Sequence, residues 1–430
     1  MSSTSPHPCK ELKYAADYDP TGWHVIYACQ DSTPDTSWGF FYKQWWGLTS
    51  TGAEELKQTC HLEKLAIQVG SNDNIIFGLL QESKGWMIMR QEYHNIYDRL
   101  SHVFERRGSG IILTGQPGIG KSYFAIYALL RCMMEGRMTL FTTSDGLCYL
   151  FDETGIRVKK EAQFNFTDLP ESNYLVPTSR TWSIFDTPKH PDESLLAHGK
   201  LFVLVTCPPK RAMYKEWMKQ ARAVQWVMNP WSEEELCLLI SNPNYTNLSE
   251  NERNQHGSPD GIQKLLYDVG PCPRDILDSI QTPIKFNEEI KSALMELHDV
   301  DMLITLFTSA DNQPNSISHK VTLITRCEPR VQDSDSGLLV YDSDICRVDF
   351  KSQKIRKSAM KHFEFLTLTE RKYFIQFTKS CPAGSQLASW VFEGFAHASI
   401  ETRPSELLEE CDSQCPGCEV ELGRRVEGIE

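Results

Sequence analysis

The chain has 430 residues, of which 40% are hydrophobic and 23% charged, and this balance is typical of a soluble globular protein with two or three domains. The net charge of −13 excludes an overall basic field that would attract nucleic acid or an anionic membrane. Neither a run of ~18 apolar residues nor an N-terminal signal segment is present, so we expect an intracellular protein without membrane spans whose 14 cysteines are mostly free thiols.

The first 85 residues are predicted to form a polar tail and an aromatic-rich segment. Residues 1–20 are polar, which predicts disorder. Residues 21–85 contain a predicted strand at 23–27, a helical pattern at 54–68 and several tryptophans. A dense aromatic group could form a ligand or peptide surface, but such side chains more often pack a small subdomain against its neighbour, and we favour packing.

A strand predicted at 85–90 and a helix predicted at 92–106 lead to the most informative motif of the chain. In many P-loop ATPases this lead-in borders the adenine base. Arg90 and Tyr93 are therefore candidates to flank a base, and a structural hinge is an equal alternative.

The stretch GQPGIGKS, residues 115–122, fits the phosphate-binding pattern G-x-x-x-x-G-K-[ST] at every fixed position. Apolar residues at 110–114 predict a buried parallel strand before the loop, and those at 123–130 predict a buried helix after it. The glycines let backbone N–H groups approach a phosphate at a helix N-terminus. Lys121 is expected to bind the β- and γ-phosphates and Ser122 to coordinate Mg²⁺. The expected nucleotide-binding residues are Gly115, Gln116, Pro117, Gly118, Ile119, Gly120, Lys121, Ser122 and Tyr123.

Two further apolar strands end in polar residues. The strand predicted at 181–186 ends in Asp186, which is placed to hold Mg²⁺ through water. Thr187 follows it where ATPases with strong turnover often have Glu, so we expect slow hydrolysis; Asp192 or Glu193 could substitute by proximity alone. The strand predicted at 201–206 ends in Thr206, which either senses the γ-phosphate or caps the next turn.

The remaining core elements follow from shorter patterns. Residues 138–143 predict a second core strand, and residues 148–158 predict an inserted β-hairpin with a glycine turn. A helix is predicted at 211–222. A strand predicted at 224–228 completes a core of five strands.

A helical lid is predicted after residue 230. Ser232 and Glu235 form a capping box that starts its first helix, whereas residues 241–260 are polar and predicted to be rich in loops. Pro273 suits the first turn of a later helix. Arg274 in that turn could reach the γ-phosphate and couple the nucleotide state to the lid position, or be an ordinary surface arginine.

Taken in order, GQPGIGKS, WSIFDT, LFVLVTCPP, NPWSEEEL and GPCPRD resemble the P-loop ATPase module of Crinkler-type effectors and retrotransposon hot spot proteins, which has fungal members. The module is similar to the signal-transduction branch of AAA-like ATPases, and the resemblance covers roughly residues 86–300. It implies a five-stranded parallel core, a helical lid, and NTP binding with slow hydrolysis as a switch. It also implies that Lys121, Asp186, Thr206 and Arg274 act on the triphosphate and that Ser122 and Asp186 hold the metal.

Related proteins often carry a second domain, sometimes a nuclease. Residues 301–430 contain a predicted strand at 322–325 and a predicted helix at 358–377, but no Asp followed by Glu-x-Lys. Glu393 and His397, four residues apart on a predicted helix, could bind a metal, although helix packing is the safer interpretation. Cys411, Cys415 and Cys418 have no close fourth ligand for zinc, so we interpret them as free thiols.

We therefore predict an α/β protein: a P-loop NTPase core with a mainly parallel five-stranded sheet, a helical lid, and additional α+β regions at both ends. The predicted divisions are a tail at 1–20, an aromatic-rich subdomain at 21–85, the NTPase core at 86–230, the lid at 231–300, a C-terminal α+β region at 301–405 and a tail at 406–430.

The expected function is Mg²⁺-dependent binding and slow hydrolysis of ATP, or of GTP, as a conformational switch toward an unknown protein partner. Two alternatives are the ATPase part of a nucleic-acid-directed enzyme with a truncated nuclease, and a transposon-derived protein that binds nucleotide without turnover. No basic stripe supports a nucleic-acid partner.

Overall fold

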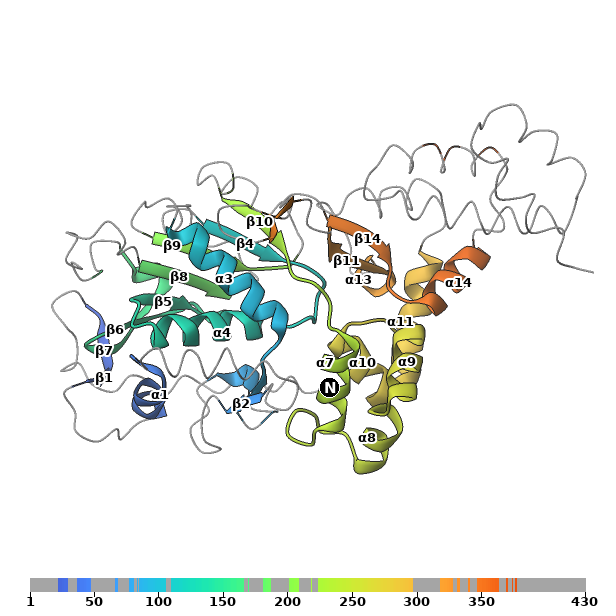
Figure 1. The fold of residues 1–430 in the computed structure, drawn as a ribbon, viewed down its shortest axis with the longest axis horizontal. Coiled ribbons are helices and arrows are strands. Elements are labelled where there is room, and N and C mark those ends of the chain that lie inside the picture. The colour runs from blue at the N-terminus through green and yellow to red at the C-terminus, as the bar shows by residue number, and fades with distance from the viewer. Residues whose placement is uncertain are drawn as a thin grey trace, which may run out of the picture.

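A computed structural model gives the fold of the chain. It describes residues 22–29, 37–47, 66–68, 77–80, 83, 85–105, 110–165, 169, 181–186, 201–208, 218, 223–296, 318–327, 331–332, 339–340, 346–362, 369, 373 and 376. The part described is an α/β structure with a large, mainly parallel sheet, as the sequence predicts (Figure 1).

The main sheet has eight strands rather than the predicted five, and five neighbouring strands of it are parallel. In spatial order they are β5 (Thr139–Thr142), β8 (Thr181–Asp186), β9 (Leu201–Thr206), β4 (Gly110–Thr114) and β10 (Val224–Val227). Nearly every residue of these strands is buried, because helices and connections cover a parallel sheet on both faces. All five predicted core strands are confirmed.

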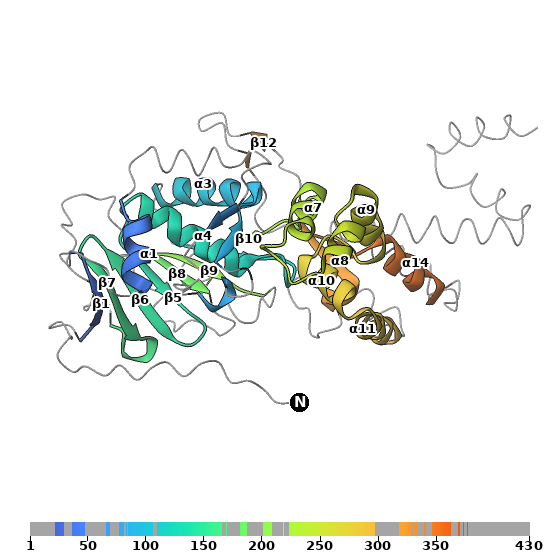
Figure 2. The ribbon, with the colours of Figure 1, turned by 90° about the horizontal axis from the view of Figure 1, so that it is seen from below.

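Three antiparallel strands extend the sheet beyond β5. The predicted hairpin, β6 (Leu147–Asp152) and β7 (Gly155–Lys160), pairs with β5 and continues the sheet. The predicted N-terminal strand, β1 (His24–Ala28), pairs with β7 as the outermost strand. The helix α1 (Ser37–Trp45) lies against this extension (Figure 2).

The N-terminal aromatics pack, as we favoured. The Trp38 ring of α1 stacks on the Tyr149 ring of β6 with centroids 4.6 Å apart, and the Tyr42 hydroxyl donates to the Asp152 carbonyl at 2.6 Å. Part of the predicted helix at 54–68 is wrong, because β2 (Ala66–Gln68) is a strand that pairs with β3 (Trp86–Ile88). The single-turn helices η1 (Gly78–Leu80) and η2 (Glu161–Gln163) lie in the connections.

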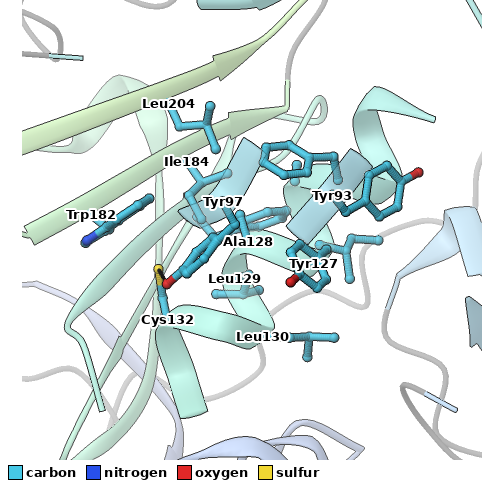
Figure 3. Close-up of a cluster of buried hydrophobic side chains, with 14 of the residues drawn as sticks. Tyr93, Tyr97, Tyr127, Ala128, Leu129, Leu130, Cys132, Trp182, Ile184 and Leu204 are labelled. Atoms are coloured by element: carbon cyan, nitrogen blue, oxygen red, sulfur yellow. Dashed lines mark hydrogen bonds between the residues drawn. The ribbon is translucent and has the colours of Figure 1, made fainter. Parts of the chain in front are cut away.

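The helices α3 (Gln91–Glu105) and α4 (Lys121–Met134) cover one face of the parallel strands (Figure 2). Eleven of the 14 residues of α4 are buried, as expected of a helix that is apolar all round. Figure 3 shows the contact between the layers, where Tyr97 of α3 stacks on Trp182 of β8 with centroids 5.5 Å apart. The loop that ends at α4 is thus attached to a rigid, closely packed layer.

Five helices follow the sheet, and all but the second of them share a separate apolar cluster that includes Leu236, Ile240 and Ile262. These lid helices are α7 (Glu233–Ser241), α8 (Glu250–His256), α9 (Pro259–Asp268), α10 (Pro273–Gln281) and α11 (Pro283–Met295). The capping box of Ser232 and Glu235 is confirmed. The stretch 241–260, predicted to be polar and rich in loops, contains the unpredicted helix α8, which starts at its own capping box and buries no residue.

Beyond the lid helices, α13 (Ser318–Val321) leads into β11 (Thr322–Arg326), which pairs antiparallel with β14 (Cys346–Phe350) before α14 (Gln353–His362). The predicted strand is confirmed, whereas the C-terminal helix starts five residues earlier than predicted. A short pair, β12 (Val331–Gln332) and β13 (Leu339–Val340), lies between. None of the described helices is long and apolar enough to cross a membrane.

Several predictions lie outside the described residues. They are the two tails, the helix at 211–222 apart from residue 218, which is helical, Thr187, Asp192, Glu193, the Glu393 and His397 pair, and Cys411, Cys415 and Cys418.

Candidate functional site

The ends of three neighbouring strands bring the predicted residues together. The loop 115–120 follows β4, Asp186 ends β8 and Thr206 ends β9. Since β4 pairs with β9 and β9 with β8, all in parallel, these carboxyl ends meet at one edge of the sheet. In the strand register, Thr206 lies opposite Asp186 on one side and Leu113 on the other.

Two glycines of the loop have conformations that other residues rarely adopt. Gly118 has a φ of 82° and Gly120 a φ of 99°, both in the left-handed region that favours glycine. A Cβ at Gly118 would lie 2.7 Å from the Arg274 Cβ, and one at Gly120 would collide with the Tyr93 hydroxyl. The sequence therefore permits both the turn of the loop and the close approach of its neighbours.

The Lys121 ammonium is folded back onto the loop. Its Nζ donates to the carbonyl oxygens of Gly115 and Gln116, each at 2.9 Å. Burial is the main cause that lowers the pKa of Lys121 to about 8, and the Arg274 charge acts in the same direction. The Lys121 ammonium, which is the positive charge of the motif, is thus held where it is largely removed from water.

Burial shifts the pKa of Asp186 in the opposite direction from that of Lys121. Burial raises its pKa, although hydrogen bonds with Thr206 and Ser122 and the charge of Lys121 oppose that change. Thr206 Oγ1 donates to Asp186 Oδ1 at 2.7 Å and to the Phe185 carbonyl at 3.3 Å. The two predicted metal ligands, Ser122 and Asp186, are therefore in contact. Among the described residues no three His, Cys, Asp or Glu side chains form a metal-binding group, so any ion here needs ligands beyond this pair.

A cavity of about 780 Å³ opens between the loop and the lid helices. Of the predicted site residues, its walls include Pro117, Gly118, Gly120, Lys121, Ser122, Tyr123, Asp186, Thr206 and Arg274. Within the described loop, Gly115, Gln116 and Ile119 do not line it. The cavity walls also include four apolar or aromatic side chains that the sequence did not single out: Trp86, Ile88, Leu239 and Tyr245.

Arg90 contacts the loop but does not line the cavity, and only 1% of its surface is exposed. Its Nε bonds the Glu235 carboxylate at 3.0 Å, and its Nη1 donates to the Ile119 carbonyl at 3.2 Å. Its Nη2 donates to the carbonyls of Asn229 and Pro230. Of the two interpretations open for Arg90, these contacts agree with the structural one: it joins the loop to the start of the lid.

Three other side chains also bond the loop, of which Tyr93 and Trp231 line the cavity wall and Cys272 does not. Tyr93 Oη donates to the Gly120 carbonyl at 2.9 Å, and Trp231 Nε1 donates to the Ile119 carbonyl at 2.8 Å. Cys272 Sγ donates to the Pro117 carbonyl at 3.0 Å, one residue before α10. Nothing local in the sequence marks Trp231 or Cys272 as loop contacts, because both partners lie more than 100 residues away.

Comparisons with known proteins agree with this geometry. A family model described as "Retrotransposon hot spot protein, P-loop domain" matches residues 112–337, more than half of the chain. Crinkler effector proteins 16 and 15 of Phytophthora infestans are each 28% identical over 170 residues. That match covers 39% of this chain and 26% of each effector, so the aligned part spans about a quarter of those relatives.

Two solved structures are similar at 12% identity and a TM-score of 0.26. One, from work on katanin self-assembly, covers 58% of this chain and 80% of its own. The other, AMPPCP-bound DnaA from Aquifex aeolicus, covers 77% of this chain and 92% of its own.

Proposed function

The chain belongs to the retrotransposon hot spot protein P-loop domain family, and from that premise we propose that it binds a nucleoside triphosphate, ATP or GTP, together with Mg²⁺. The observation that carries the proposal is the convergence of Lys121, Ser122 and Asp186 on one cavity beside a glycine loop. The loop N–H groups and Lys121 would hold the β- and γ-phosphates.

The electrostatics of the site support an anionic ligand with a cation. Lys121 has a lowered pKa and Asp186 a raised one, so burial disfavours the charged form of each. A phosphate beside Lys121 and a cation beside Asp186 would favour the charged form of each. Ser122 and Asp186 supply the hard oxygen ligands that Mg²⁺ prefers, with water and phosphate oxygens as the others. When bound, Mg²⁺ neutralises charge that develops on the phosphates.

Arg274 and the lid support a switch. Arg274 lies in the first turn of α10 and reaches the cavity across Gly118, so it is placed to contact the terminal phosphate. A ligand that bridges the loop and α10 would favour one lid position over others. Thr206, which bonds Asp186, would orient that carboxylate toward the metal. We propose that hydrolysis is slow, because the residue after Asp186 is Thr rather than Glu.

The test is an equilibrium titration with ATP and with GTP, with and without Mg²⁺. We expect Mg²⁺-dependent binding by the wild type and at least a ~100-fold loss in Lys121→Ala, which corresponds to about 2.7 kcal/mol. Lys285→Ala removes a lysine whose side chain is 75% exposed on α11 and serves as the matched control, with unchanged affinity expected. A wild type without nucleotide affinity would refute the proposal.

Turnover is measured separately, by phosphate release under multiple-turnover conditions. We expect a rate below about 1 s⁻¹, the low end of the usual range for enzymes. A faster rate would contradict slow hydrolysis and leave nucleotide binding in place.

A further inference from the structure

The side chain of Gln116 points away from the cavity although it belongs to the phosphate loop. Gln116 is fully buried and does not line the cavity. Its Nε2 donates to the carbonyls of His319 at 2.7 Å and Thr322 at 2.9 Å, and its Oε1 accepts the Ile324 N–H at 3.2 Å. One loop side chain therefore bonds three backbone groups, one in α13 and two in β11, more than 200 residues later in the chain.

We use the name C-terminal clamp for residues 318–326 and 346–362, which include α13, β11, β14 and α14. The clamp also contacts the core beside the loop: the Arg326 guanidinium bonds Glu92 of α3 at 3.0 and 3.1 Å. In addition, the Arg326 N–H donates to Asn229 Oδ1 at 2.9 Å, just after β10. Glu92 and Asn229 are themselves joined by a 2.9 Å bond.

The clamp contacts the lid through α10. Lys351 forms a buried ion pair with Asp275, and Lys320 bonds the same carboxylate at 3.3 Å. Burial would raise the pKa of Asp275, but the charges of the two lysines hold it below its usual value. Asp275 directly follows Arg274, the residue proposed to reach the terminal phosphate. The clamp thus bonds the loop, the core and the lid at three places around the nucleotide site, and it lies beside the lid helices (Figure 1).

From these contacts we propose that Gln116 is a positioning residue that couples nucleotide binding to docking of the C-terminal clamp. The docked clamp holds the loop in its binding conformation, and a bound nucleotide holds the clamp docked. The inference rests on the proposed nucleotide site, and reciprocity follows because a coupling free energy acts equally in both directions.

The link lies within a single residue. The main-chain carbonyl of Gln116 accepts Lys121 Nζ at 2.9 Å, whereas its side chain holds β11. Phosphate oxygens would compete for the Lys121 ammonium. A bound nucleotide would therefore change the bonding of the Gln116 main-chain carbonyl and, through the side-chain amide of the same residue, act on β11.

The experiment measures hydrogen exchange of the β11 amides with and without Mg²⁺–ATP, together with ATP affinity. In the wild type we expect nucleotide to slow exchange at residues 322–326 about tenfold or more, within the usual 5–150-fold range of coupling. In Gln116→Ala we expect ATP to bind roughly tenfold more weakly and the nucleotide effect on β11 to disappear. Gln91→Ala is the matched control, because it removes an exposed glutamine of α3 whose side chain, within the described part of the chain, bonds Asn95 one turn later.

Two further variants separate coupling from general damage. Gln116→Glu keeps the shape but loses the N–H donors and faces two carbonyl oxygens, so it should behave like Gln116→Ala rather than like the wild type. Lys351→Met loosens the clamp from the lid side without altering the loop, and it should weaken ATP binding in the same direction.

Unchanged β11 exchange on binding of ATP by the wild type would overturn the coupling and leave the nucleotide site intact. Normal ATP affinity in Lys351→Met, with β11 exchange accelerated, would overturn it equally. Absence of ATP binding by the wild type would instead refute the proposed function.

Discussion

The two sides of the phosphate loop differ in how their polar groups are satisfied. On the outer side, Arg90 and Cys272 donate to loop carbonyls and do not line the cavity. Tyr93 and Trp231 also donate to loop carbonyls, although both line the cavity wall. On the cavity side, Lys121 bonds only the loop's own carbonyls in the described contacts, and burial disfavours its charged form. The polar groups on the outer side have hydrogen-bond partners within the protein, whereas those on the cavity side are arranged for a ligand.

This difference separates stability from binding. Changes on the outer side should destabilise the fold, and changes on the cavity side should impair ligand binding without such a cost. The comparison fails if the two groups of variants cannot be distinguished by unfolding and titration experiments.

The largest effect on stability is expected for Arg90→Met. The substitution leaves the buried Glu235 carboxylate without its cationic partner and removes a donor from three carbonyls, of which that of Ile119 keeps its bond from Trp231. We expect a loss of about 3–5 kcal/mol in the free energy of unfolding. Urea unfolding measures it. Lys354→Met, which breaks an exposed ion pair with Asp268, should cost less than about 1 kcal/mol. Equal losses in the two variants would show that Arg90 does not fix the loop.

On the cavity side, Asp186→Asn should weaken Mg²⁺–ATP binding about tenfold, or 1.4 kcal/mol, and leave Mg²⁺-free binding unchanged. The same variant should be no less stable than the wild type at pH 7, because burial raises the pKa of Asp186 and disfavours its charged form. A carboxyl group whose pKa is higher in the folded state than in the unfolded state stabilises the fold at low pH. This contribution is lost as the pH rises through the pKa of the folded state. The wild type should therefore gain stability relative to Asp186→Asn as pH falls, and the opposite trend in paired unfolding curves would contradict this electrostatic account.

A smaller effect is expected for Trp231→Phe, which keeps an aromatic ring and removes the indole N–H that bonds the Ile119 carbonyl. We expect a loss of about 1 kcal/mol in the free energy of unfolding, the usual contribution of one hydrogen bond, with affinity for ATP changed less than threefold. A loss of affinity without a loss of stability would show instead that Trp231, which lines the cavity wall, acts on the ligand rather than on the loop.

The elements that the sequence predicts best are those with a strong local signal. The five core strands, the glycine loop and the capping box of Ser232 each depend on residues within about ten positions of one another, and periodicity or spacing reveals them. The convergence of Lys121, Ser122 and Asp186 followed from the rule that parallel strands end at the same edge of a sheet.

The outer side of the loop could not be predicted in this way. Arg90 meets Glu235 across 145 positions, and Gln116 meets β11 across more than 200. Such pairings depend on tertiary docking, and a single glutamine or arginine carries no periodic pattern. The short helix α8 was missed for a different reason: none of its seven residues, ENERNQH, is buried, so its sequence has no periodic apolar pattern.

The most direct test of the nucleotide site is a crystal structure with Mg²⁺ and a non-hydrolysable ATP analogue. We expect the triphosphate in the glycine loop, Lys121 Nζ moved from the carbonyls of Gly115 and Gln116 to phosphate oxygens, and the metal between Ser122 and Asp186. A structure in which the analogue binds elsewhere, or in which Lys121 keeps its bonds to the loop while the analogue is bound, would contradict the account.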